Sequence, residues 1–90
     1  MAQAVVDPAE LRRFAFNLKR YIADLQTNSA GVHGQLLALG DTWRDQEHDR
    51  FKQDMEQTMK EIERFVEACN VHIPFLLRKA ERIEEYLQQR

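Results

Sequence analysis

Two long runs of apolar residues, each repeating with the period of an α-helix, constrain the fold of this chain more than any other feature. The first run comprises Leu11, Phe14, Leu18, Ile22, Leu25, Val32, Leu36 and Leu39. The second comprises Phe51, Met55, Met59, Ile62, Phe65, Val66, Cys69, Ile73, Leu76, Leu77, Ala80, Ile83 and Leu87. At about 100° per residue, each run falls in one stripe, as is typical of an amphipathic helix. The sequence therefore predicts an all-α protein.

Residues that commonly begin or end a helix mark the limits of these runs. Asp7 is a good N-cap, Pro8 suits the first helical position, and Glu10 stands where a capping box needs it. Gly40 follows the first run, where glycine often terminates a helix. The expected elements are a first helix over about 8–39, a corner over 40–45 and a second helix over about 46–88.

Pro74 interrupts the second apolar run. A proline inside a helix removes one hydrogen bond and clashes with the carbonyl one turn back. The stripe nevertheless keeps its phase from Cys69 to Ile83. We therefore expect a kink near Pro74, and the alternative is that the second helix ends there.

The short corner and the width of the stripes together predict association. Two long helices joined by so short a segment become antiparallel neighbours. Each stripe is roughly 120° wide, so a neighbouring helix covers only one side of it. Residues 1–90 are therefore expected to form a single helical-hairpin domain that dimerises into a four-helix bundle. The residues expected in the core or the dimer contact are Leu11, Phe14, Leu18, Ile22, Leu25, Met55, Met59, Ile62, Phe65, Val66 and Ile73.

Several classes of function are not expected from this sequence. The balance of 15 acidic and 13 basic residues argues against nucleic-acid binding. No run approaches the roughly 20 apolar residues of a membrane span, and the N-terminus lacks the pattern of a secretory signal peptide. The three histidines do not repeat the Glu-x-x-His pattern of metal-binding bundles, and no base lies near Cys69 to activate it. We expect no enzyme, no cofactor, no metal and no small-molecule substrate.

The corner carries a resemblance to a known family. The chain has about 90 residues, two expected helices, and a mid-chain Trp43 followed eight positions later by the aromatic Phe51. In these features it resembles the WXG family, small proteins related to the early secreted antigenic target of mycobacteria. The resemblance covers nearly the whole chain. It implies a non-catalytic substrate or escort partner of a type VII-like (ESX) secretion system, which leaves the cell without a signal peptide.

The same resemblance implies partners and a set of corner residues. Family members pair as helical dimers, so the expected partner is a second copy or a paralogous WXG-like protein, with a secretion ATPase as a further partner. Trp43, Asp45 and Phe51 would form the corner motif. Trp43 can either plug the end of the hairpin or be read by the export machinery, and these two roles are compatible.

The chain departs from the family at two positions. Asp45 replaces the motif glycine, either because aspartate tolerates a positive φ or because it caps the second helix. Family members with the export signal carry a tyrosine followed four residues on by Asp or Glu, whereas Tyr86 is followed by Arg90. This difference favours an escort whose partner supplies the signal. The alternative is a cytoplasmic structural adaptor of the same helical-bundle type that is not exported.

Some apolar residues lie off the two stripes, among them the small Ala68 and four larger residues. The four larger residues are Phe16, Val71, Phe75 and Tyr86. A cluster of exposed apolar residues can mark a contact surface, whereas single exposed aromatics are common and need no explanation. These four residues form a candidate partner surface.

Overall fold

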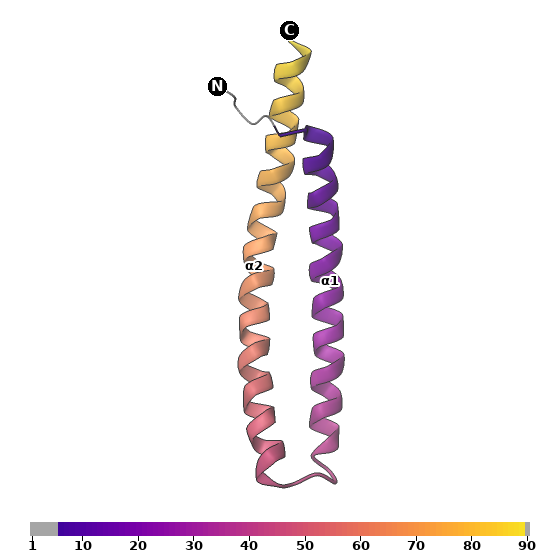
Figure 1. Ribbon diagram of the computed structural model, residues 1–90, viewed down its shortest axis with the longest axis vertical. Coiled ribbons are helices and arrows are strands. Elements are labelled where there is room, and N and C mark those ends of the chain that lie inside the picture. The colour runs from indigo at the N-terminus through magenta and orange to yellow at the C-terminus, as the bar shows by residue number, and fades with distance from the viewer. Residues whose placement is uncertain (1–5, 90) are drawn as a thin grey trace.

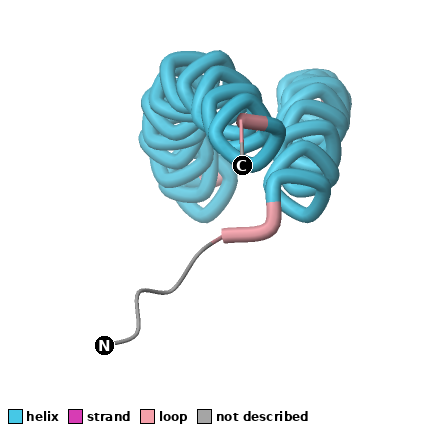
Figure 2. Tube along the Cα trace, turned by 90° about the horizontal axis from the view of Figure 1, so that it is seen from above, coloured by secondary structure: helices cyan, strands magenta, loops and turns pink. Residues whose placement is uncertain are grey.

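Two long α-helices and a short corner make up residues 6–89, the part of the chain that the computed structural model describes. Helix α1 spans Pro8–Leu39 and helix α2 spans Gln46–Gln88. They run antiparallel, side by side (Figure 1; Figure 2). The predicted all-α hairpin is confirmed. Arg90 and the first five residues, on which the expectations about export partly depend, lie outside the described residues.

Local signals fix where α1 begins and ends. Asp7 has an extended backbone, and its Oδ1 accepts a hydrogen bond from the Ala9 amide at 2.9 Å. Pro8 then occupies the first helical position, where its missing N–H costs nothing. At the other end, the Gly40 amide donates to the Leu37 carbonyl at 3.1 Å with right-handed backbone angles. The helix therefore closes on a tightened last turn, without a left-handed residue.

Helix α2 is one continuous element that passes through Pro74. The alternative in which α2 ends at the proline is therefore wrong, because the apolar stripe on either side packs on the same neighbour. A kink at this level stays a prediction.

The core is a single line of side chains between the two helices. Its buried residues are Ala15, Ile22 and Leu36 on α1 and His48, Val66, Cys69, Ile73 and Ala80 on α2. The half-buried members of the predicted stripes are Leu11, Leu18, Leu25, Met55, Met59, Ile62, Leu76, Leu77 and Ile83. Six stripe residues remain exposed in the hairpin, namely Phe14, Val32 and Leu39 on α1 and Phe51, Phe65 and Leu87 on α2. Among residues 6–89 no large side chain is completely buried.

The hairpin is long, thin and incompletely covered. It measures 67 × 24 × 16 Å, so it is one layer of helices thick. Its accessible surface is 7282 Å², whereas a compact monomer of this mass exposes roughly 5500 Å². Neither helix is long and apolar enough to cross a membrane. The fold therefore leaves a large area that is available for contact with another chain.

Three contacts define the register of the two helices. Arg12 forms an ion pair with Glu84 near the open end of the hairpin. The rings of Tyr21 and Phe65 meet edge to face with centroids 6.4 Å apart. Nearer the corner, His33 Nε2 lies 3.8 Å from Glu56 Oε2. Helix α2 continues beyond the start of α1 (Figure 1).

Candidate functional site

The corner between the helices is closed by backbone hydrogen bonds to the last turn of α1. The amides of Thr42 and Trp43 both donate to the Leu39 carbonyl, at 3.1 and 2.7 Å. The Asp41 amide donates to the Ala38 carbonyl at 3.2 Å. No residue of the described chain has a positive φ. The chain therefore reverses direction through ordinary backbone conformations.

Asp45 is the N-cap of α2. Its backbone is extended, with φ −108° and ψ −179°, and its Oδ1 accepts a hydrogen bond from the His48 amide at 3.1 Å. This bond lowers the pKa of Asp45 below its ordinary value of 3.8, with smaller contributions from the Trp43 side chain and the Glu47 amide. Of the two explanations for aspartate at this position, capping is confirmed and positive φ is wrong.

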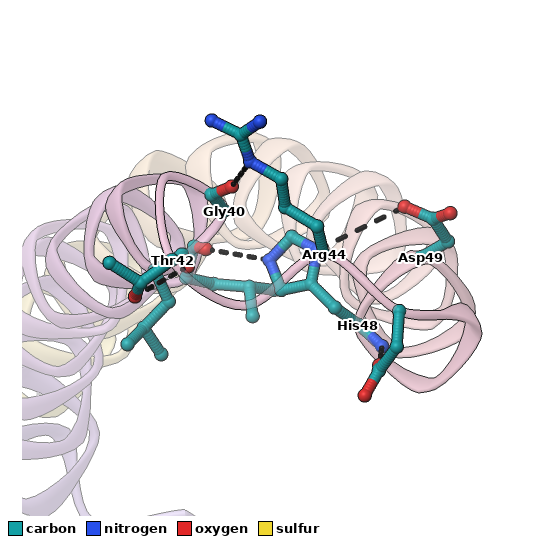
Figure 3. Close-up of polar contacts among 8 residues, drawn as sticks. Gly40, Thr42, Arg44, His48 and Asp49 are labelled. Atoms are coloured by element: carbon teal, nitrogen blue, oxygen red, sulfur yellow. Dashed lines mark hydrogen bonds and ion pairs between the residues drawn. The ribbon is translucent and has the colours of Figure 1, made fainter.

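His48 performs the reciprocal task for α1. Its ring is buried, with 6% of the residue exposed, and its Nε2 lies 3.1 Å from the Leu36 carbonyl oxygen. Because a carbonyl only accepts, Nε2 carries the hydrogen. The last carbonyls of a helix lack partners within that helix. Figure 3 shows the His48 imidazole reaching across the corner toward this end of α1. Each helix is thus capped by a side chain at the start of α2.

Trp43 packs on this histidine. The two rings meet edge to face with centroids 4.9 Å apart, and Trp43 is half-buried. Gly40 makes room for the imidazole, since a Cβ at that position would lie 3.3 Å from His48 Cε1. The indole is therefore fixed at the tip of the hairpin, and part of it remains accessible.

An open hollow of about 420 Å³ lies beside the Trp43 ring. Its lining includes two acids, Asp41 and Asp49, and two bases, Arg44 and Lys52. Arg44 folds back over the corner and donates from Nε to the Gly40 carbonyl at 3.2 Å (Figure 3). Among the described residues, no three His, Cys, Asp or Glu side chains converge as a metal site would need. A partly exposed indole among mixed charges is suited to contact with a protein.

A second candidate surface runs along one side of the hairpin, and we call it the apolar face. Its exposed members are Phe14, Tyr21, Val32 and Leu39 on α1 and Phe51, Phe65 and Leu87 on α2. Their spacings on each helix are close to whole numbers of turns, so they share one side. The Tyr21–Phe65 contact joins the two rows into one face.

The predicted corner motif is divided between these two surfaces. Trp43 and Asp45 lie together at the corner, where both interact with His48. Phe51 is 52% exposed and lies on α2, on the same side as Phe65. The motif residues therefore contribute to the tip of the hairpin and to its apolar face.

The four residues of the candidate partner surface are all exposed, from 48% for Phe75 to 72% for Val71. Val71, Phe75 and Tyr86 share the outer side of α2, whereas Phe16 belongs to α1. Phe75 also lines a hollow of about 430 Å³ with arginine and glutamate side chains of the same helix. A contact at this surface stays a prediction.

Sequence reasoning did not identify the role of His48. As a metal ligand in a helical bundle, His48 would need a repeated Glu-x-x-His pattern, which the sequence lacks. The available signal was its phase, because His48 precedes the stripe residue Met55 by seven residues, two turns of helix.

Comparison with known proteins adds one finding. The family model WXG100, described as proteins of 100 residues with WXG, matches residues 3–87. No curated protein and no solved structure matches the chain. The match spans α1, the corner and nearly all of α2.

Proposed function

Because this chain belongs to the WXG100 family of small proteins associated with type VII secretion, we propose that it is a secreted substrate or escort partner of such a system. It acts as one half of a helical dimer and carries out no catalysis. Its partner is a second copy or another WXG-like hairpin, which covers the apolar face.

The observation that carries this proposal is the exposure of the apolar face. Phe14, Tyr21 and Phe65 are each about half exposed although they belong to or border the stripes that form the core. Fully burying such a side chain contributes about 1.5–3 kcal/mol. The hairpin exposes roughly 1800 Å² more than a compact monomer would. Obligate dimers bury about 2000–5000 Å² in total, half of it on each chain, so an extensive interface with a partner hairpin accounts for this excess.

The corner has a separate role in the proposal. Trp43 is held by His48 and remains half-buried beside the hollow. We propose that the export machinery, including a secretion ATPase, recognises the chain by binding this tip of the hairpin. Tyr86 is followed four residues later by Arg90 in place of the acid of the family's export signal. The chain therefore travels as an escort, with the missing signal supplied by its partner.

The pairing is tested by two substitutions on α2. Phe65→Asp places a charge within the apolar face and should abolish association, because burying an unpaired charge costs several kcal/mol. Gln53→Asp is the matched control, since Gln53 is exposed on the other side of α2 and outside both candidate surfaces, and it should leave association unchanged. The mass of the purified species in solution gives the answer. Intact association of the Phe65→Asp variant would refute pairing through this face.

Export is tested in a host that contains the secretion system. The chain is produced with and without each candidate WXG-like partner, and culture medium is compared with cell lysate. Export only with a partner is the expected result. Export of the chain alone would contradict the escort role, and retention under every condition would favour a cytoplasmic structural adaptor. A Trp43→Ala variant that stays folded and paired should still fail to leave the cell.

A further inference from the structure

The outer side of α2 carries a second row of residues with the spacing of a helix that packs against another helix. Between positions 64 and 82 its members alternate in steps of four and three residues, as the contact positions of paired helices do. Every member is exposed. We call this row the outer seam, and its members are Arg64, Ala68, Val71, Phe75, Arg78 and Arg82.

The outer seam lies away from both surfaces that the hairpin and its proposed pairing use. At about 100° per residue, it falls on the side of α2 opposite the buried Val66 and Ile73. Figure 2 shows α1 against one side of α2 only. The seam is also roughly 120° around the helix from Phe51 and Phe65 of the apolar face. A partner hairpin on the apolar face therefore leaves the outer seam uncovered.

The seam has an apolar centre with arginines at both ends. Val71 is 72% exposed and Phe75 is 48% exposed at its centre. Its three charged members are all arginines, whose planar guanidinium groups bind carboxylates through two parallel hydrogen bonds. Arg64, Arg78 and Arg82 take part in none of the ion pairs formed among residues 6–89. They are therefore available to carboxylates of another molecule.

A hollow on the seam indicates the shape of the side chain that it would receive. It has a volume of about 430 Å³, and its lining includes Phe75, Arg78 and Arg82. In paired helices, a side chain of one helix enters a hole between four residues of the other. These three residues supply one aromatic and two guanidinium corners of such a hole. Glutamate, whose methylene groups end in a carboxylate, suits this lining.

We infer that the outer seam binds an acidic amphipathic helix of another protein. The contact row of that helix carries apolar residues at its centre and glutamates at both ends, so that it complements the seam in both respects. Arg64 and Arg82 are 18 residues apart, about 27 Å along a helix, so the partner contributes about five turns. This contact adds a second partner to the pairing proposed above and does not use the same surface.

Acidic residues beside the seam favour a helix over a broad anionic surface. Glu67, Glu81 and Glu85 line one side of it. A membrane or a nucleic acid extends over both sides and would meet these carboxylates, whereas a helix about 10–12 Å across follows the seam alone. Glu81 and Glu85 follow Arg78 and Arg82 by three residues, and a base followed by an acid is the weaker order for an ion pair within a helix.

A pair of synthetic peptides tests the inference on the full chain. The first is a helix of about 21 residues, three heptads, with leucines at the centre of its contact row and glutamates at both ends. The second has lysines in place of these glutamates. Fluorescence anisotropy of the labelled peptides measures both dissociation constants. The wild-type chain should bind the glutamate peptide at least about tenfold more tightly, because opposite charges attract and like charges repel across an interface.

Charge reversal on the seam should reverse this preference. Arg78→Glu combined with Arg82→Glu should weaken binding of the glutamate peptide about tenfold and strengthen binding of the lysine peptide, a change that loss of folding cannot produce. Phe75→Ala should weaken the glutamate peptide without changing the preference. Arg13→Glu combined with Arg20→Glu is the matched control, since both residues are exposed on α1 and the net charge changes equally. It should leave the preference unchanged.

Four results would overturn the inference. They are equal binding of both peptides by the wild-type chain, an unchanged preference in the Arg78→Glu, Arg82→Glu variant, and a preference that the control also reverses. The fourth is binding to vesicles of phosphatidylserine that this variant loses, with no binding of either peptide, since a membrane would then occupy the seam. The variant should also keep the mass in solution of the wild-type chain. A lower mass would mean that a second copy covers the seam, which overturns the inference and leaves the proposed function standing.

Discussion

At the scale of single residues, the corner works because two side chains at the start of α2 cap the adjacent ends of both helices. The Asp45 carboxylate accepts a hydrogen bond from the His48 amide at the start of α2. The His48 ring donates one to the Leu36 carbonyl at the end of α1. An aspartate at the position of the family glycine therefore costs no backbone strain, since its φ of −108° is available to any residue. Trp43 rests on this pair of caps.

The ionised carboxylate of Asp45 should make stability depend on pH in acid. Its pKa in the folded protein is below 3.8, chiefly because of the His48 amide, so its contribution is complete above about pH 4 and is lost as the pH falls through the folded value. Asp45→Asn keeps an effective N-cap without a titrating group. Thermal unfolding between pH 2 and 6, in roughly half-unit steps, should fall less steeply for Asp45→Asn. Parallel curves for the two proteins would contradict this assignment.

The buried ring of His48 should stabilise the hairpin through its hydrogen bond. His48→Leu removes the donor and leaves the Leu36 carbonyl without a partner, which should cost about 1–3 kcal/mol in unfolding free energy. His48→Gln retains an N–H donor and should lose less. Denaturant unfolding of both variants makes the comparison. Equal losses would show that the ring's packing on Trp43, and not the bond, is what matters.

The residue scale also shows how far sequence reasoning could reach. The cap by Asp45 was foreseeable because an N-cap depends on residues that are neighbours in the chain. The part played by His48 was not, because its acceptor Leu36 belongs to the other helix and only the folded corner brings them together. At Gly40 the sequence predicts only the end of the first helix, whereas the folded corner also needs the space that a missing Cβ leaves for the His48 imidazole.

At the scale of elements, both helices could be predicted because their signals are local and their stripes are long. Asp7 and Pro8 begin α1, and Gly40 follows its last residue. The sequence alone could not show whether α2 continues through Pro74 or ends there. The apolar stripe keeps its phase across the proline, and this is compatible with either a kinked helix or two separate helices. What decides is the packing of residues on both sides of it, among them Ile73 and Ala80, which are buried.

Pro74 should hold α2 below its maximum stability. Proline supplies no N–H to the carbonyl one turn earlier, and in a helix interior it is about 3 kcal/mol less favourable than alanine. Pro74 is exposed, so Pro74→Ala removes little packing and should raise the midpoint of thermal unfolding. A matched Val71→Ala change, also at an exposed site of α2, should have a small effect. A lower midpoint for Pro74→Ala would show that the proline shapes a contact surface.

At the scale of the whole molecule, the hairpin is one layer of helices, 16 Å thick. The sequence predicted this exposure in general terms, because each stripe is wider than one neighbour can cover. It did not distinguish which stripe residues would remain outside. Phe14 and Phe65 remain exposed because they lie at the edge of their stripes. Ile22 and Val66 lie at the centre of theirs and are buried.

Folding that is coupled to association should depend on protein concentration. If the apolar face is covered by a second copy, the midpoint of thermal unfolding should rise as the chain is concentrated, by mass action. Phe65→Asp should remove that dependence and lower the midpoint at every concentration. Calorimetry over a roughly hundredfold range of protein concentration measures this change in the unfolding midpoint. A midpoint independent of concentration would mean that the hairpin is stable alone.

The reciprocal caps also imply an order of events in time. The bond between His48 and Leu36 closes a loop of 12 residues, whereas the Arg12–Glu84 pair closes one of 72. Short loops lose less entropy on closure and form faster. Contacts between the two helices should therefore form first at the tip of the hairpin and then progressively toward its open end. His48→Leu should slow refolding, whereas Arg12→Gln should act mainly by speeding unfolding, as stopped-flow kinetics can resolve. The tip of the hairpin would then be its first ordered part, complete before the face that meets a partner has formed.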